Sequence, residues 1–256
     1  MSALSAECTK LRTLPGTVWL LLGIVAATVA VSVITAAGAS CPVAGCPQDP
    51  ARMSLAGVDL GQAVVAVLAV LMVSGEYSSG MITVTLAAMP RRTSVLAAKA
   101  AVLTGLVLVT GGLAVAGSLL AGRLILPGHG FTAGHGFAAL SLADGPVLRA
   151  AAGSVLYLAL IGLLSLGLAS LVRDSAAAIG LALGLIYLFP VVAAALSQQW
   201  QRHLQQAGPM SAGLDIQATT GLHSLPLSPW AGLAVLAAWA AAGLLAGAVA
   251  LRCRDV

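Results

Sequence analysis

Six long runs of apolar residues constrain the fold of this chain more than any other feature. A transmembrane helix needs about 20 apolar residues to cross about 30 Å of hydrocarbon, and six such runs follow one another along the 256 residues. Charged residues make up 8% of the chain, whereas about 25% is usual in soluble domains. We therefore expect an all-α membrane protein with one transmembrane domain, 1–256, whose helices span about residues 16–38, 54–74, 100–121, 150–172, 175–196 and 230–251.

The positions of lysine and arginine predict the orientation of these helices, because cytoplasmic loops are enriched in both residues. With both termini in the cytoplasm, the inner side carries Lys10, Arg12, Arg91, Arg92, Lys99, Arg173, Arg252 and Arg254, and the outer side only Arg52, Arg123, Arg149 and Arg202. The loop 75–99 is then cytoplasmic, and segments 39–53, 127–146 and 197–229 are external. The net charge of +4 suits this topology and predicts no nucleic-acid partner. The preference for arginine over lysine is typical of a GC-rich genome. We expect a multi-pass protein of the plasma membrane, from a bacterium.

Asp59 is the one ionisable residue in the predicted second span, 54–74, and it lies near the start of that span. Only 16 residues separate it from Glu76, so it lies either at the outer interface or just inside the bilayer, facing protein. We favour the interface, with Gln62 one turn further along. Ionisable residues at such depths often mark a substrate or ion path, and Asp59 and Gln62 are therefore candidate residues of a substrate path.

The outer segments hold two further groups of reactive side chains. Cys41 and Cys46 form a disulfide if the outer face is oxidising, although the intervening Pro42 stiffens the short loop, and both states remain open. His129 and His135 lie in a glycine-rich loop within 127–146. A metal site needs three or four ligands of defined geometry, so we expect a solvated loop and no metal.

Two short amphipathic segments flank the predicted helices. The first follows the second span, in GEYSSGMITVTLAAMPRRTSVLAAKA, residues 75–100. Apolar residues recur at helical spacing over 81–89, and Pro90 ends that pattern. Such a helix either binds another protein or rests on lipid. The second segment, residues 3–14, predicts an elbow helix lying in the membrane interface.

Known catalytic motifs are missing from the sequence. It contains neither the phosphate-binding loop G-x-x-x-x-G-K-[ST] nor the zinc motif H-E-x-x-H. No histidine lies within a predicted span to serve as the base of an intramembrane serine protease. Small residues such as Gly162, Ser165, Gly167 and Ser170 more simply allow helices to approach closely. We expect a protein that is not an enzyme, binds no cofactor and takes energy from a partner.

The segment 75–100 resembles the loop that follows the second helix in ABC-2 type permeases. In that family a glutamate, an aromatic residue, two residues and a glycine precede an apolar helix, a proline and basic residues. Met81 departs from the threonine that the family often has after the glycine. The chain also closes on Arg254–Asp255, as actinobacterial members often do. The residues that the resemblance assigns to docking and coupling are Glu76, Tyr77, Gly80, Met81, Pro90, Arg91 and Arg92.

The resemblance implies an exporter half. Two permease copies, identical or different, would form a dimer in the bilayer, and each would bind a separate cytoplasmic ATP-binding cassette subunit that holds ATP and Mg. The alanine- and leucine-rich spans fit an apolar or amphipathic substrate, such as a drug, a natural product, a lipid or a peptide, which would move outward.

Two other classes fit six spans. One is the substrate-capture subunit of an ATP-driven importer, which would bind its ligand by itself. The other is a membrane anchor or assembly protein without a transport role. The loop signature of ordinary import permeases, which begins Glu-Ala-Ala, is absent.

Overall fold

Helices account for every regular element in the part of the chain that the computed structural model describes, residues 15–42, 46–78, 92–172 and 174–253. Six of them are long and apolar enough to cross a membrane, which confirms the predicted all-α class. These six are α2 (Pro15–Gly38), α4 (Val58–Ser78), α6 (Arg92–Ile125), α7 (Gly145–Val172), α8 (Ser175–Ala194) and α11 (Pro229–Cys253). The short helices are α3 (Pro50–Ser54), η1 (Leu126–His129), η2 (Ala133–His135), α9 (Gln198–Ala207), α10 (Pro209–Leu214), η3 (Asp215–Gln217) and η4 (Leu222–Ser224).

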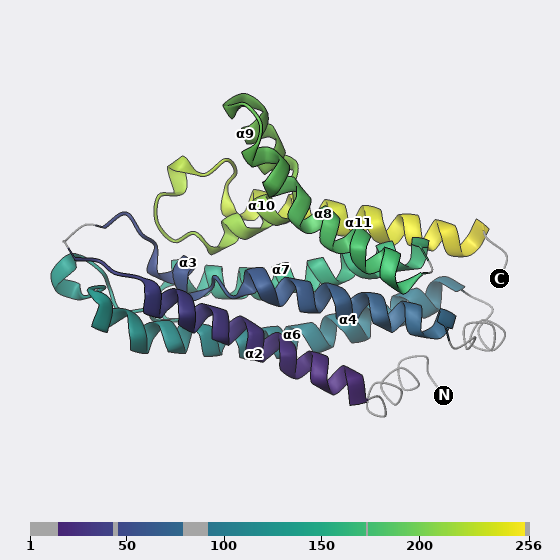
Figure 1. Cartoon of the computed structure of the whole chain (residues 1–256), viewed down its shortest axis with the longest axis horizontal. Helices are drawn as coiled ribbons and strands as arrows, with labels where there is room; N and C mark the ends of the chain where they lie inside the picture. Colours follow the sequence, from purple (N-terminus) through teal and green to yellow (C-terminus); the bar gives the residue numbers. More distant parts are fainter. Residues whose placement is uncertain (1–14, 43–45, 79–91, 173, 254–256) are drawn as a thin grey trace.

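The six long helices run alternately up and down (Figure 1). At one end of the bundle α2 begins, α11 ends, and α4 ends where α6 begins; we call this the junction end. At the opposite end, the cap end, lie α3 and η1, and α9 projects from the bundle beyond α8 (Figure 1). Six passes therefore place the start of α2 and the end of α11 on the same side.

Helices α4 and α7 form the centre of the bundle. In their most apolar windows 56% and 61% of the residues are buried, against 22–28% in the other four long helices. Helix α7 contacts α11, α4 and α6 along its length, and α4 also contacts α2 and α8. The outer faces of the four peripheral helices carry exposed large side chains such as Trp19, Ile34, Val109 and Leu245. An apolar outer surface of this kind suits lipid as the solvent.

The second span was predicted to begin at residue 54, but α4 begins at Val58, because the chain turns between α3 and α4. Gly57 lies in that turn and presses against α2. A Cβ atom at Gly57 would lie 1.7 Å from the carbonyl oxygen of Thr28, and its N–H donates to Ser32 Oγ at 3.1 Å. This contact between backbones needs a glycine, and it makes Val58 the first residue of the transmembrane helix.

The third predicted span, 100–121, is longer in the structure, because α6 already begins at Arg92. Val95 and Leu96 are buried, so this first part of α6 belongs to the bundle and not to the predicted loop 75–99. Lys99, expected at a cytoplasmic surface, is only 4% exposed. Its Nζ donates to the carbonyl oxygen of Met72 in α4 at 3.0 Å. A hydrogen bond to a backbone carbonyl partly compensates the loss of water around a buried ammonium group.

The segment 197–229 lies on the surface of the bundle only in part. Helix α9 is polar, but α10 and η3 insert against the long helices. Ala212 and Ile216 have no exposed surface. A Cβ atom at Gly153 of α7 would lie 2.0 Å from Ile216 Cγ1, and one at Gly213 would lie 2.6 Å from the ring of Tyr157. Residues 209–218 therefore pack against the long helices.

A disulfide joins Cys41 and Cys46, whose Cα atoms are 6.0 Å apart. The backbone N–H of Cys41 donates to the carbonyl oxygen of His129 at 2.9 Å. Gly130 follows with a φ of +94°, and a Cβ atom there would meet the carbonyl oxygen of Cys41 at 2.2 Å. These contacts attach the segment after α2 to the η1 turn.

Candidate functional site

The residues that the family resemblance singled out lie at the junction end or outside the described residues. Glu76 and Tyr77 belong to the last turn of α4, and Arg92 is the first residue of α6. Gly80, Met81, Pro90 and Arg91, and with them the predicted helix 81–89, lie outside the described residues, as does the predicted elbow 3–14. The docking role of this segment therefore stays a prediction.

Gln62 is the centre of a polar cluster inside the bundle, near the cap end of α4. Its side chain has no exposed surface. Its Oε1 accepts a hydrogen bond from the hydroxyl of Tyr157 in α7, and its Nε2 donates to the carbonyl oxygen of Asp59 at 3.1 Å. The hydroxyl of Tyr187 in α8 donates to the same carbonyl oxygen. The cluster thus joins three helices through groups that would be costly to bury without partners.

Asp59 lies in the first turn of α4, where its backbone and its side chain have different surroundings. The backbone carbonyl is held by Gln62 and Tyr187, whereas the side chain is on the exposed surface of the chain. Asp59 and Gln62 are therefore adjacent, as the sequence predicted, but only Gln62 faces the interior. The two tyrosines were not predicted as site residues. A signal for them exists, because a hydroxyl in an apolar span usually needs a hydrogen-bond partner.

Two aspartates share the electrostatic influence of one arginine at the cap end. Arg52, exposed on α3, interacts electrostatically with both Asp59 and Asp215. Asp215 lies in η3 and is 6% exposed. Burial raises the pKa of its carboxyl to about 6, although the charge of Arg52 opposes that rise. One guanidinium thus acts electrostatically on two carboxylates.

Asp49 fastens the inserted segment to α3. Its Oδ1 accepts from the backbone of Ala51 at 3.1 Å and of Arg52 at 3.2 Å, which caps α3. Oδ1 also accepts from the Thr219 hydroxyl at 2.7 Å. Oδ2 accepts from the N–H groups of Thr219 at 2.5 Å and Thr220 at 3.0 Å. Burial raises the pKa of this carboxyl, but the hydrogen bonds outweigh burial and leave the pKa below its ordinary value.

Replacing Asp49 with asparagine is expected to lower the free energy of unfolding by about 2 kcal/mol at pH 7, because an amide nitrogen cannot accept the bonds that one carboxylate oxygen now accepts. The lowered pKa of Asp49 also determines in which direction the stability changes with pH. Stability from ionised Asp49 is present above the unfolded-state pKa near 3.8 and is lost as the pH falls through the lower folded-state value. Thermal unfolding in detergent at pH 7 and at pH 3 measures both effects. Equal melting temperatures of the variant and the parent at pH 7 would contradict this role.

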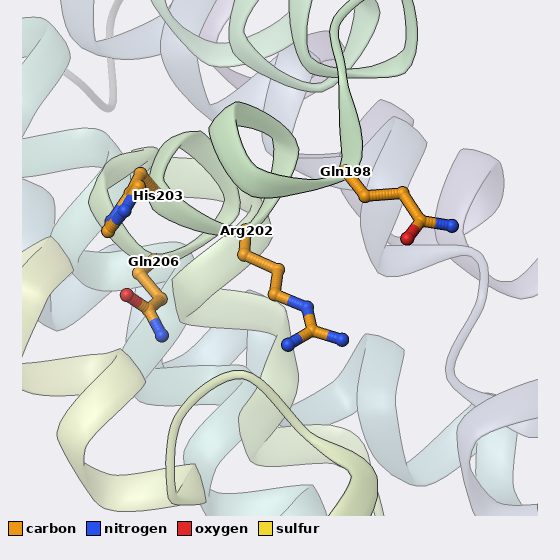
Figure 2. A pocket seen from close by; sticks show the side chains of 4 residues that line it. All are labelled: Gln198, Arg202, His203 and Gln206. Carbon is orange, nitrogen blue, oxygen red and sulfur yellow. The ribbon is translucent and has the colours of Figure 1, made fainter.

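Helix α9 borders a surface hollow of about 490 Å³. Gln198, Arg202, His203 and Gln206 line it, all from α9 (Figure 2). The side chains of Gln198, Arg202 and His203 are exposed, and that of Gln206 is partly buried. Gln206 Nε2 also donates to the carbonyl oxygen of Pro226 at 3.0 Å, which holds the chain after η4 beside α9. The hollow is open, and Arg202 gives it one fixed positive charge. Because all four lining residues belong to α9, no other element contributes a buried polar group to the lining.

Metal binding finds no support in the part of the chain that the structure describes. No group of three histidine, cysteine, aspartate or glutamate side chains there is close enough to hold an ion. His129 instead places Nδ1 3.0 Å from the carbonyl oxygen of Ile125. This arrangement fits a histidine that helps to close the η1 turn.

Comparison with known proteins adds no family to this description: no family model matches the chain, and no curated protein matches it either. The fold defines an all-helical protein with six helices able to span a membrane. This class of protein follows from the six helices alone. Its function has to be argued from the site.

Proposed function

We propose that this chain is the transmembrane permease subunit of an ATP-driven ABC-2 type exporter. It would move an apolar or amphipathic substrate outward, with a separate cytoplasmic ATP-binding cassette subunit supplying the energy and a second permease copy completing the path. The observation that carries the proposal is the connection from α4 to α6. The sequence pattern of Glu76, Tyr77, Gly80 and Pro90 falls between α4 and α6 along the chain. Helix α4 ends and α6 begins at the junction end (Figure 1).

The charges of the chain support a cytoplasmic junction end. By chain connectivity, eight of the 12 basic residues belong to segments that enter or leave helices at this end, and the other four belong to segments at the cap end. Enrichment of basic residues marks the cytoplasmic side. The segment around Glu76 would then face a cytoplasmic partner, and the disulfide of Cys41 and Cys46 would lie on the oxidising side.

The contact between α4 and α6 explains how movement of a partner would reach the bundle. Lys99 Nζ holds the carbonyl oxygen of Met72 at 3.0 Å, about one turn before Glu76 on α4. A displacement of the α4–α6 connection would therefore move both helices together. Because α4 also carries Asp59 and Gln62 at its other end, the displacement would reach the polar cluster and the inserted α10–η3 segment.

The mechanism has three steps in this proposal. ATP binding closes two cassette subunits, the closure displaces residues 76–92 of each permease copy, and the two copies open a path between them toward the outside. Coupling of this kind is a free-energy link between two sites. Docking of the ATPase and transport should therefore be lost together.

Purification of the tagged chain from its native membrane in mild detergent tests the proposal. We expect a cassette ATPase to co-purify in a fixed ratio, identified by mass spectrometry. A parallel purification of an established exporter complex controls for the detergent. A chain that arrives without an ATPase while the control complex stays intact would overturn the proposal. If a small molecule co-purified in place of the ATPase, the capture subunit would be favoured; with neither, the membrane anchor would be favoured.

A further inference from the structure

We propose that Asp59 binds the cationic group of an amphiphilic substrate, and that the exporter therefore prefers lipophilic cations. The proposal rests on the proposed export function and names the substrate class of that site. The residues that carry it are Asp59, Tyr187 and Arg52, together with two exposed apolar side chains, Leu60 of α4 and Val191 of α8.

The Asp59 carboxylate is available to a ligand. Among the described residues, no hydrogen bond to its side-chain oxygens and no ion pair is formed, although the side chain is exposed. Asp49, at the same end, shows the contrast, because five hydrogen bonds occupy its two oxygens. The hydrogen bonds of the cluster hold the backbone carbonyl of Asp59 and so position the first turn of α4. They leave its carboxylate free.

The charge balance around Asp59 favours a cation. Arg52 is the cation that interacts with it electrostatically, and Arg52 also interacts electrostatically with Asp215. When both carboxylates are ionised, this group carries one negative charge in excess. A positive ligand would neutralise that charge, whereas a negative ligand would add to it. Ionisable groups at the edge of a span are costly to leave unpaired, and this cost favours such a partner.

The surroundings of Asp59 fit the rest of an amphiphile. Tyr187 donates its hydroxyl to the backbone carbonyl of Asp59, so a partly exposed aromatic side chain reaches the turn that carries the carboxylate. Cations bind favourably to aromatic faces. Apolar side chains adjoin both residues: Leu60, next to Asp59, is 46% exposed, and Val191, one turn from Tyr187, is 66% exposed. A cationic head at the cap end of α4 would thus leave its apolar part along α4 and α8, within the hydrocarbon.

Tetraphenylphosphonium and tetraphenylborate test the charge preference directly, because these two ions have nearly the same shape and opposite charges. The full chain in lipid nanodiscs is dialysed to equilibrium against each ion, and binding to empty nanodiscs is subtracted. We expect Asp59→Asn to weaken tetraphenylphosphonium binding by about tenfold. Tetraphenylborate binding should stay unchanged or become stronger. Each ion is compared only between variants, so the different affinities of the two ions for lipid do not affect the result.

Two further variants separate a charge effect from a fold effect. Asp59→Glu retains the carboxylate and should restore most of the tetraphenylphosphonium affinity. Asp144→Asn removes an exposed carboxylate from the loop before α7 at the same end and should change nothing. Equal binding of tetraphenylphosphonium by the parent chain and Asp59→Asn, with both proteins folded, would overturn the proposal. Since this binding needs no ATPase, a failure here leaves the exporter assignment standing, and a missing ATPase leaves the cation site standing.

Discussion

Replacement of Gly167 with valine is expected to prevent most of the chain from accumulating as a folded membrane protein. Gly167 lies in α7 where that helix crosses α11, and a Cβ atom there would lie 2.3 Å from the backbone carbon of Gly243 and 2.5 Å from its oxygen. Both obstacles are backbone atoms, so no side-chain rotation can relieve the clash. The two helices would have to separate along the most extensive helix contact of the bundle.

The expected cost is large because packing is the main attraction between helices in lipid. Overpacking a well-filled interior costs about 1–3 kcal/mol and sometimes more, and we expect Gly167→Val to reach or exceed the upper value. Fluorescence-detected size-exclusion chromatography after stepwise heating would measure the remaining folded fraction. Gly112→Val is the matched control, because Gly112 lies in α6 with no atom within 4 Å of its added Cβ. Similar melting curves of Gly167→Val and the parent would refute the close contact of α7 and α11.

If the chain is the exporter subunit that we propose, replacement of Glu76 with lysine is expected to uncouple it from the ATPase. The variant reverses the charge in the last turn of α4, where the proposed docking segment begins. A coupling free energy of about 1–3 kcal/mol corresponds to a 5- to 150-fold effect, and we expect the ATPase rate of the purified complex to fall by at least the lower factor. The amount of permease in the membrane should stay the same.

The control for Glu76→Lys is a charge change elsewhere at the junction end. Asp174 caps α8 by accepting a hydrogen bond from the N–H of Ala177 at 2.7 Å. Asparagine also caps helices, so Asp174→Asn removes a charge and preserves the fold. Its ATPase rate should match that of the parent complex. An unchanged rate in Glu76→Lys, with the ATPase still bound, would remove the coupling role from Glu76 and leave it as an anchor at the lipid headgroups.

The sequence predicted the number of spans correctly and their limits less well. Length and apolar character alone define a helix that can cross the bilayer, so all six were found. Limits depend on neighbours, which hydropathy does not register. Lys99 appeared to end a loop, but α6 extends past it because α4 offers the carbonyl of Met72. The break before Val58 likewise depends on how closely Gly57 approaches Thr28.

The sequence likewise predicted some residues of the candidate site and missed others. Asp59 and Gln62 stood out because polar residues are rare at the ends of apolar spans, and the structure places them in one network. Tyr157 and Tyr187 joined that network only through folding, since they lie 95 and 128 residues from their partners along the chain. Sequence patterns of local periodicity do not encode contacts over such separations.

The sequence by itself determined that the chain has six apolar helices and where its charges accumulate, because the cost of placing polar groups in hydrocarbon acts on each segment separately. Tertiary structure decided which polar groups meet. The insertion of α10 and η3 against α7 depends on the missing side chains of Gly153 and Gly213, and the attachment of Thr219 to Asp49 joins residues 170 positions apart. Whether a carboxylate becomes saturated, as in Asp49, or stays free, as in Asp59, depends on the donors that other segments bring to it in space.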